Sequence, residues 1–258
     1  MKQSLTLVKV GGGIVEDPAS LATLLNGFAK IQGLKVLVHG GGRTATQLAG
    51  RLGIETQMAN GRRITDARTL QVVTMVYGGL VNKNIVAGLS TMGIKALGLT
   101  GADMAVIRAH KRPLTPEGID YGFVGDVDRV DADALKLIID GGIIPVVAPL
   151  TLGDGGTLLN TNADTVAGET AKALSRLYDV TLMFCFEKKG VLRNPDDEDS
   201  VISHIDTRLY QQLKEEGVVS GGMLPKIDNS FAALNGGVSR VVITRADLLG
   251  RDGTTITL

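Results

Sequence analysis

The chain has 258 residues, of which 44% are hydrophobic, so it can bury the core of one large α/β unit or of two closely joined lobes. Lys plus Arg and Asp plus Glu both total 27, which leaves no net charge to attract nucleic acid or an anionic membrane and favours a small-molecule partner. The single cysteine, Cys185, excludes an internal disulfide framework, and three scattered histidines give no Cys/His zinc site, so no protein metal site is predicted.

The N-terminal residues lack the apolar core and small-residue cleavage site of a signal peptide. No apolar run approaches the roughly 20 residues that are needed to cross a bilayer. We therefore expect a cytoplasmic protein whose mature chain starts at Met1. Glycine is abundant, at 34 residues, and aromatic residues make up only 3%. This bias is expected where the backbone approaches ligands closely and where strands and helices pack tightly.

Short apolar runs alternate with helical patterns at the start of the chain, which is the rhythm of βαβ units. A long helical stretch from Asp66 to Met92, broken near Gly78–Gly79, has small and apolar residues that suit packing against helices or a second subunit. The first four expected elements are strand Leu5–Val10, helix Pro18–Ile31, strand Lys35–His39 and helix Thr44–Leu52.

The middle of the chain, from Ile94 to Asp131, is richer in β-branched residues and turn signals, so we expect a strand followed by hairpins that form a lid. The α/β rhythm then returns, and the whole pattern predicts an α/β fold, a three-layer αβα sandwich with a central, mostly parallel sheet. The later expected elements are helix Ala132–Asp140, strand Ile143–Ala148, helix Ala163–Leu177, strand Val180–Phe186, helices Thr207–Glu216 and Leu224–Leu234, and strand Ser239–Thr244.

Two glycine runs follow the first two expected strands. Lys9 precedes Gly11, Gly12 and Gly13, and His39 precedes Gly40, Gly41 and Gly42. Ligands of α/β proteins bind at the carboxyl ends of strands, where glycines let backbone N–H groups face an anion and a lysine adds positive charge. The two runs therefore predict a phosphate cradle, with a glycine turn beside a surface lysine as the alternative.

The second run also fits the dinucleotide fingerprint G-x-G-x-x-A, from Gly40 to Ala45. We reject a dinucleotide enzyme, because no acidic residue ends a following strand at the distance needed to hold a ribose. Neither a P-loop nor the His-Arg-Asp and Asp-Phe-Gly motifs of protein kinases occur. If the protein transfers phosphate, it uses another scaffold.

Two further polar clusters stand at the starts of expected helices. Asn160, Asn162 and Asp164 alternate around the start of the helix expected from Ala163, and helix caps alone do not account for all three residues. Two amides could bind polar groups of a ligand, and the carboxylate could orient lysines. Lys226 follows a glycine turn in the first turn of its helix, where it opposes the helix dipole, so an anionic partner explains it best.

In this order the motifs resemble the amino-acid kinase family over essentially the whole chain. The motifs are Val8–Gly12, His39–Gly42, Asn60–Thr65, Val81–Lys83, Gly98–Asp103, Gly122–Asp126, Ile144–Pro149, Asn160–Asp164 and Gly221–Lys226. The resemblance implies an amino-acid kinase or carbamate kinase-like fold and ATP-dependent phosphorylation of the side-chain carboxylate of an N-acylated glutamate, with Mg²⁺ on the phosphates. Acetyl and succinyl both remain open as the acyl group.

The resemblance also implies the roles of individual residues. Arg63 lies in the segment that clamps the substrate α-carboxylate in the family. The implied catalytic residues are Lys9, Lys226 and Asp164; the nucleotide site is Gly11, Gly12, Gly190 and Lys226; and the substrate site is Gly41, Gly42, Arg63, Asn160 and Asn162. We expect residues 1–178 to form an N-terminal lobe for acylglutamate and dimerisation, and residues 179–258 to form a nucleotide-binding lobe.

One motif departs from the family. A Thr/Ser-Asp-Val-x-Gly-Val-Leu pattern usually touches the nucleotide, whereas this chain has Phe186, Glu187 and Lys188 before Gly190. The chain also lacks the N-terminal helical extension of arginine-inhibited hexamers, so we expect an arginine-insensitive homodimer. The alternatives are another amino-acid kinase, acting on aspartate, free glutamate or a nucleotide, and a catalytically dead amino-acid sensor.

Overall fold

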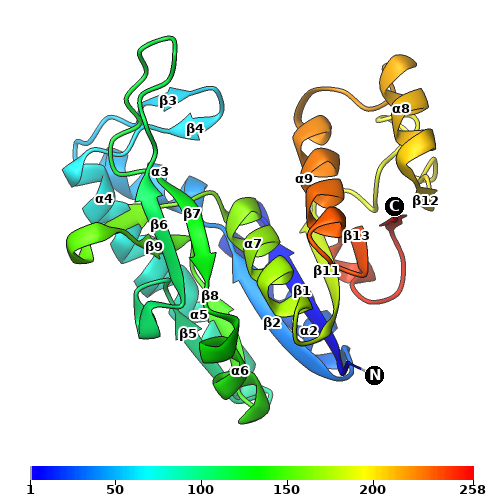
Figure 1. The fold of residues 1–258 in the computed structure, drawn as a ribbon, viewed down its shortest axis with the longest axis horizontal. Helices are drawn as coiled ribbons and strands as arrows, with labels where there is room; N and C mark the ends of the chain where they lie inside the picture. The colour runs from blue at the N-terminus through cyan, green and yellow to red at the C-terminus, as the bar shows by residue number, and fades with distance from the viewer. Residues whose placement is uncertain (1) are drawn as a thin grey trace.

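The computed structural model of the protein describes residues 2–258, so Met1, the first residue of the expected N-terminal lobe, lies outside the described part. The main sheet has eight strands in the order β12-β14-β13-β11-β1-β2-β8-β5 (Figure 1). Neighbouring strands in it are parallel except for β13 and β14, which confirms the predicted sheet. The strands are β1 (Ser4–Val10), β2 (Leu34–His39), β5 (Ala96–Leu99), β8 (Ile144–Val147), β11 (Asp179–Phe186), β12 (His204–Ile205), β13 (Arg240–Arg245) and β14 (Thr254–Ile256).

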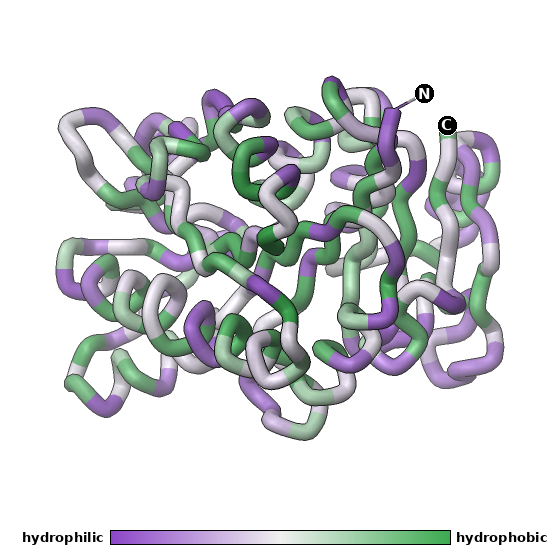
Figure 2. The backbone as a smooth tube through the Cα atoms, turned by 90° about the horizontal axis from the view of Figure 1, so that it is seen from below, coloured by the Kyte–Doolittle hydropathy of each residue, from purple (hydrophilic) through white to green (hydrophobic). Residues whose placement is uncertain are grey.

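Helices cover both faces of this sheet and make the predicted three layers. Helices α1 to α5 pack into the core on one face, and α6 to α9 pack into the core on the other. Figure 2 shows hydrophobic segments crossing the middle of the molecule and hydrophilic residues gathered in the outer loops. The helices are α1 (Gly12–Glu16), α2 (Pro18–Lys30), α3 (Gly42–Arg51), α4 (Ala67–Val73), η1 (Thr74–Val81), α5 (Asn82–Thr91), η2 (Asp103–Ala105), α6 (Ala132–Asp140), η3 (Asp154–Gly156), α7 (Ala163–Ser175), α8 (Thr207–Glu215), η4 (Gly221–Met223), α9 (Leu224–Asn235) and η5 (Ala246–Leu248).

Side chains alternate between the two cores along the central strand β1. Leu5 and Leu7 belong to the core beneath α7, whereas Val8 and Val10 belong to the core beneath α2. Because successive side chains of a strand point to opposite faces, Lys9 shares the face of Leu5 and Leu7. The strand pattern therefore directs Lys9 toward α7.

The predicted break in the long helix at Gly78–Gly79 is wrong. Helix α4 runs without interruption into η1, a π-helix, and on into α5. The two glycines lie inside the π-helix, while Val76 and Tyr77 of the same segment are buried. Burial of this inner face keeps the backbone helical, and the two glycines lie in a π-turn of the kind that occurs inside longer α-helices.

This helix also corrects the expectation that no apolar segment is long enough to cross a membrane. By length and composition alone, Ala67–Thr91 could do so, with a mean hydropathy of 1.3, and 44% of the window is buried inside the protein. The core helix of a globular protein passes the same test, and the inner face of this helix packs into the core beneath α2.

Small strands beside the main sheet carry part of the site. The predicted hairpin region contains the antiparallel pair β6 and β7, which joins a second sheet in the order β10-β9-β6-β7. Strands of two or three residues carry too little periodicity to be recognised in the sequence, so most of these were not predicted. The added strands are β3 (Met58–Ala59), β4 (Arg62–Arg63), β6 (Ile107–Lys111), β7 (Gly125–Val130), β9 (Leu150–Leu152) and β10 (Leu158–Asn160).

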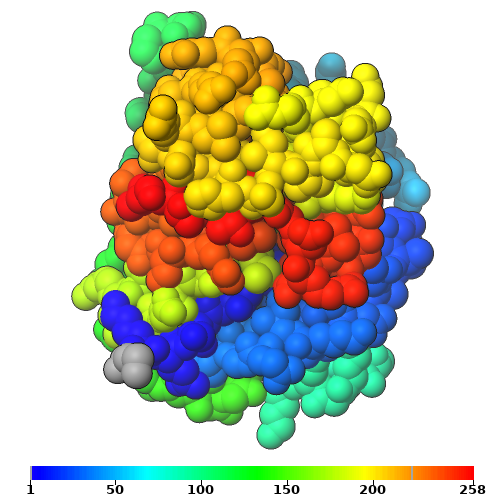
Figure 3. Space-filling model, turned by 90° about the vertical axis from the view of Figure 1, so that its right-hand side faces the viewer, coloured from blue at the N-terminus to red at the C-terminus, as the bar shows by residue number. Residues whose placement is uncertain are grey.

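Elements from β11 onward gather on one side of the molecule, and the second sheet lies on the other (Figure 1). Figure 3 shows the first of these sides, on which residues of the 190–235 range form one large part of the surface. Strand β11 begins at Asp179, directly after Tyr178, the last residue of the N-terminal lobe predicted from the sequence.

Candidate active site

The two glycine runs meet where β1 and β2 end. These strands are parallel neighbours with Val10 opposite His39, so the residues that follow them lie side by side. The N–H of Gly40 donates to the carbonyl of Val10 at 3.0 Å. A Cβ on Gly40 would lie 3.0 Å from the nitrogen of Gly12, and one on Gly12 would lie 3.3 Å from the nitrogen of Gly41. Side chains at these glycines would push the two loops apart.

The close approach of the loops gathers backbone donors. In residues 2–258, no carbonyl or side-chain oxygen accepts from the N–H of Gly12, Gly41 or Gly42. Gly12 and Gly42 are also the first residues of α1 and α3, whose opening N–H groups have no partner within the helix. The sequence predicted an anion cradle here, and the structure brings its donors together.

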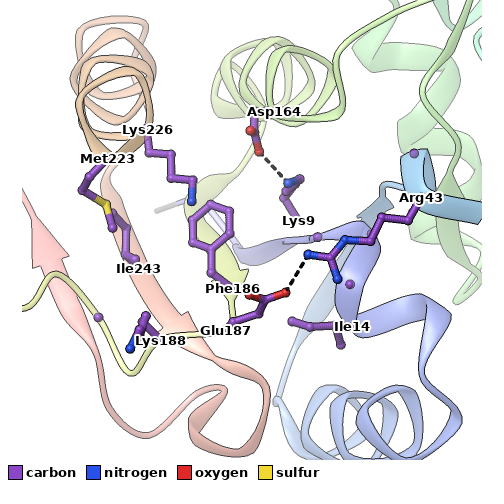
Figure 4. Close-up of a pocket in the computed structure, with 15 residues that line it drawn as sticks. Lys9, Ile14, Arg43, Asp164, Phe186, Glu187, Lys188, Met223, Lys226 and Ile243 are labelled. Atoms are coloured by element: carbon purple, nitrogen blue, oxygen red, sulfur yellow. Dashed lines mark hydrogen bonds and ion pairs between the residues drawn. The ribbon is translucent and has the colours of Figure 1, made fainter. Parts of the chain in front are cut away.

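Lys9 and Asp164 form an ion pair between β1 and α7. Nζ of Lys9, a residue with only 6% of its surface exposed, lies 2.7 Å from Oδ1 of Asp164 (Figure 4). The contact lacks hydrogen-bond geometry, and buried Oδ1 has no hydrogen-bond partner among the described residues. Asp164 is not the helix cap, because Oδ1 of Asn162 accepts from the N–H groups of Asp164 at 2.8 Å and Thr165 at 3.1 Å.

Lys226 enters the same space from the first turn of α9. Its Nζ lies 3.8 Å from the centre of the Phe186 ring, and Nζ of Lys9 lies 5.1 Å from that centre, so the ring lies beside both cations (Figure 4). Burial lowers the pKa of Lys226; nearby Asp164 acts to raise this pKa, and nearby Lys9 acts to lower it further. Asp164 therefore forms an ion pair with Lys9 and acts on Lys226 electrostatically, without an ion pair.

These residues line a cavity of about 440 Å³, which we call the lysine cavity. It contains the residues predicted to be catalytic and to bind nucleotide: Lys9, Gly11, Gly12, Asp164, Gly190 and Lys226. A Cβ on Gly190 would lie 2.6 Å from Oγ1 of Thr254, so close packing alone requires glycine there.

Sequence reasoning assigned no role to several residues of the lysine cavity. Phe186 is the last residue of β11, Glu187 follows it, and Arg43 follows Gly42. Nη2 of Arg43 lies 3.4 Å from Oε1 of Glu187, an exposed ion pair across the cavity (Figure 4). The signal that could have found Phe186 is its place at the carboxyl end of a parallel strand.

A second cavity of about 230 Å³, which we call the arginine cavity, adjoins the first at Gly42. It contains every residue predicted to bind substrate: Gly41, Gly42, Arg63, Asn160 and Asn162. Arg62 and Tyr77, which also line it, were not predicted. Burial, with nearby Arg112, lowers the pKa of Arg62, and burial raises the pKa of Tyr77.

Arg63 ties β4 to the start of α3. Its guanidinium donates to the carbonyl of Gly42 at 2.9 Å, to Oγ1 of Thr46 at 2.8 Å and to Oγ1 of Thr56 at 3.1 Å. A guanidinium has five N–H donors, so two remain for a ligand in the arginine cavity.

The two asparagines also keep free polar groups. Nδ2 of Asn160 donates to Oγ1 of Thr65 at 3.0 Å, and its Oδ1 has no donor among the described residues. Asn162 uses Oδ1 as the helix cap, which leaves its amide N–H groups for a ligand. The cavity thus offers donors from Arg63 and Asn162 and an acceptor from Asn160.

The fold and these adjoining cavities are those of a kinase for a small anion, with cations and backbone donors on one side and substrate-recognition groups on the other. The chain belongs to the amino acid kinase family, whose family model matches residues 4–245.

Named relatives share most of the chain. It is 63% identical to the acetylglutamate kinase of Bacteroides fragilis over 255 residues, which cover 99% of this chain and 97% of the relative. The acetylglutamate kinase of Methanopyrus kandleri is 40% identical, with 98% of this chain and 100% of the relative covered.

Solved structures agree on the fold. A Streptococcus mutans protein is 29% identical, with a TM-score of 0.79 and 98% of both chains covered. Carbamate kinase from Giardia lamblia bound to AMP-PNP is 14% identical, with a TM-score of 0.68 over 99% of this chain and 98% of that chain. The predicted amino-acid kinase or carbamate kinase-like fold is confirmed.

Proposed function

We propose that the protein transfers the γ-phosphoryl group of ATP to the γ-carboxylate of N-acetyl-L-glutamate, giving N-acetyl-L-glutamyl 5-phosphate. This is the second step of the acylated route to arginine and ornithine. The observation that carries the proposal is the junction of the lysine and arginine cavities at Gly42 in a chain 63% identical to a named acetylglutamate kinase.

The mechanism needs alignment and charge stabilisation but no base, because the attacking carboxylate is already ionised at neutral pH. ATP lies in the lysine cavity, with its phosphates near Lys226 and the free N–H group of Gly12. Its γ-phosphoryl group reaches the junction with the arginine cavity, near the free N–H groups of Gly41 and Gly42. A carboxylate oxygen bonds to the γ-phosphorus as the bond to the ADP oxygen breaks. Lys9 stabilises the transferring phosphoryl group, and Asp164 holds the lysines in place.

Mg²⁺ fits this cavity as an ion held mainly by the ATP phosphates. Among the described residues no group of three His, Cys, Asp or Glu side chains could form a metal cage. Asp164 and Glu187 of the lysine cavity are already paired with Lys9 and Arg43. When bound through phosphate oxygens and water, Mg²⁺ would neutralise developing charge.

In the arginine cavity, Arg63 binds the substrate α-carboxylate and the two asparagines bind the acylamide. Free Oδ1 of Asn160 suits the amide N–H, and the free amide of Asn162 suits a carbonyl oxygen. The names of the relatives favour acetyl over the succinyl alternative.

Kinetics with N-acetylglutamate, N-succinylglutamate, glutamate and aspartate test the function. We expect ATP-dependent acyl phosphate formation, trapped with hydroxylamine, at the highest kcat/KM with N-acetylglutamate. A higher value with another acceptor would contradict the assigned substrate. No product with any acceptor would instead favour a catalytically dead sensor.

Arg63→Ala is expected to weaken N-acetylglutamate binding about tenfold or more, because it removes a permanent positive charge and the N–H donors that remain for a carboxylate. ATP affinity should change little. Calorimetry with each ligand measures both values, with Arg51→Ala, an exposed arginine in the last turn of α3, as the control. Equal losses for the two ligands would show that Arg63 acts only by holding Gly42.

The kcat/KM for ATP is expected to fall at alkaline pH as Lys226 loses its proton. Burial lowers the pKa of this lysine, so the free enzyme loses the charge at a lower pH than an exposed lysine would. Lys226→Arg should remove this alkaline decline, since arginine stays protonated. A wild-type profile that is flat up to the ordinary lysine pKa would contradict the proposed role.

We propose that residues up to Tyr178 form the acylglutamate-binding lobe and that those from Asp179 onward form the nucleotide-binding lobe of a cytoplasmic homodimer. Met75 and Leu80 on η1 are 52% exposed, and Leu97 on edge strand β5 is 41% exposed. An open strand edge and apolar side chains suit a second copy of the chain. A monomer in sedimentation equilibrium would contradict the dimer.

A further inference from the structure

The mechanism above leaves one buried polar network without a role. His39, at the end of β2, is 0% exposed, and Asn82, at the start of α5, is 1% exposed. The two residues lie behind the loop formed by Gly40, Gly41 and Gly42 and do not line either cavity. Buried polar groups are costly unless they are paired, so their contacts define what this network does.

The orientation of the Asn82 amide follows from two of its neighbours. Nδ2 lies 2.9 Å from the carbonyl oxygen of Val146, which can only accept a hydrogen bond. Oδ1 lies 3.1 Å from Nζ of Lys83, which can only donate one. The second hydrogen of Nδ2 is therefore the one directed to Nε2 of His39, 3.1 Å away.

This amide fixes the tautomer of His39. Because Nε2 accepts from Asn82, Nδ1 carries the proton of the neutral ring. Nδ1 lies 2.7 Å from the carbonyl oxygen of Gly40 and donates to it. Burial, helped by nearby Lys83 and opposed by the hydrogen bond to Gly40, lowers the pKa of His39 to about 4, so the ring stays neutral around pH 7.

Holding the Gly40 carbonyl also sets the direction of a donor. In a trans peptide the C=O of one residue and the N–H of the next point in opposite directions. With the Gly40 carbonyl turned to His39, the N–H of Gly41 is turned away from it. The nitrogen of Gly41 is also the atom that approaches Gly12 across the two loops.

We propose that His39 and Asn82 are positioning residues for phosphoryl transfer, which orient the Gly40–Gly41 peptide so that the Gly41 N–H points at the transferring phosphoryl group. This inference rests on the proposed function of the site. Along this network Lys83 donates a hydrogen bond to Asn82, Asn82 donates to His39, and His39 donates to the carbonyl of Gly40.

Gly98 gives independent support for the network. A Cβ at this position on β5 would lie 1.9 Å from Oδ1 of Asn82 and 2.6 Å from Nζ of Lys83. Nζ of Lys83 also lies 3.2 Å from the carbonyl oxygen of Gly98. The strand therefore leaves room for the Asn82 side chain only because residue 98 has none.

Two substitutions of His39 separate the two ring nitrogens. In His39→Asn the side-chain amide nitrogen takes roughly the place of Nδ1 and can still donate to Gly40. In His39→Gln the side-chain amide oxygen reaches roughly the place of Nε2 and accepts from Asn82, so that contact survives while the donation to Gly40 is lost. We expect His39→Gln to lower kcat about tenfold or more with little change in the KM for ATP, whereas His39→Asn stays within about threefold of wild type.

Thermal unfolding of both variants controls for stability. Equal losses of kcat in the two variants, or losses that follow the fall in melting temperature, would overturn the positioning role. Nitrogen-15 NMR of wild-type His39 gives a second test, which needs no substitution and so does not depend on whether a variant folds. We expect a protonated Nδ1 and an unprotonated Nε2 between pH 6 and pH 8, and the opposite tautomer would overturn the proposal. This readout does not depend on which acceptor the enzyme phosphorylates.

Discussion

Replacing Lys9 or Lys226 with alanine is expected to lower kcat about a hundredfold or more, by analogy with the loss of one preorganised donor to a transition state. Both ammonium groups face the lysine cavity, and Lys9 is only 6% exposed. Charge that develops on the transferring phosphoryl group is stabilised more strongly by fixed, partly desolvated cations than by water. Affinity for ATP should change less than kcat, because the triphosphate keeps the other lysine and the backbone donors.

Methionine variants separate the charge of each lysine from its packing. Lys9→Met and Lys226→Met retain an apolar stem near Phe186 but remove the ammonium group, so we expect the same loss of kcat as with alanine. Lys214→Ala on α8 removes an exposed lysine remote from both cavities and should leave kcat unchanged. Near-normal turnover in either Lys9 or Lys226 variant would remove that residue from the mechanism.

The main elements of the fold could be predicted because their patterns are long and regular. Helix α6 coincides with its predicted range, Ala132–Asp140, and the other predicted helices of the α/β units end within two residues of their expected bounds. The glycine loops could be predicted because each follows an apolar strand and precedes a helix. Lys9 was placed beside the cradle for the same reason.

The rest depends on contacts between distant parts of the chain. The role of His39 could not be predicted from the sequence, because its hydrogen-bond partner Asn82 is 43 residues away. Phe186 looked like a departure from a motif, and its place beside two lysines appears only when β1, β11 and α9 come together. The sequence also could not divide the roles in Asn160–Asp164, where the structure makes Asn162 the cap and pairs Asp164 with Lys9.

Asp164→Asn is expected to lower kcat about a hundredfold while leaving the fold intact. The substitution is nearly isosteric, and Asn162, which caps α7, is untouched. Losing the carboxylate leaves the Lys9 ammonium without its partner, which costs about 1–2 kcal/mol and lowers the melting temperature by several degrees. Asp131→Asn is the matched control, since Asp131 caps α6 and asparagine caps equally well.

ATP binding and pH dependence show whether Asp164 organises both lysines. Removing a negative charge beside the phosphates should leave the Kd for ATP unchanged or lower it, so a fall in kcat would reflect lost positioning rather than lost binding. Because Asp164 raises the pKa of Lys226, the variant should also lose kcat/KM for ATP at a lower pH than wild type. Normal kcat with an unshifted pH profile would show that Asp164 does not organise the lysines.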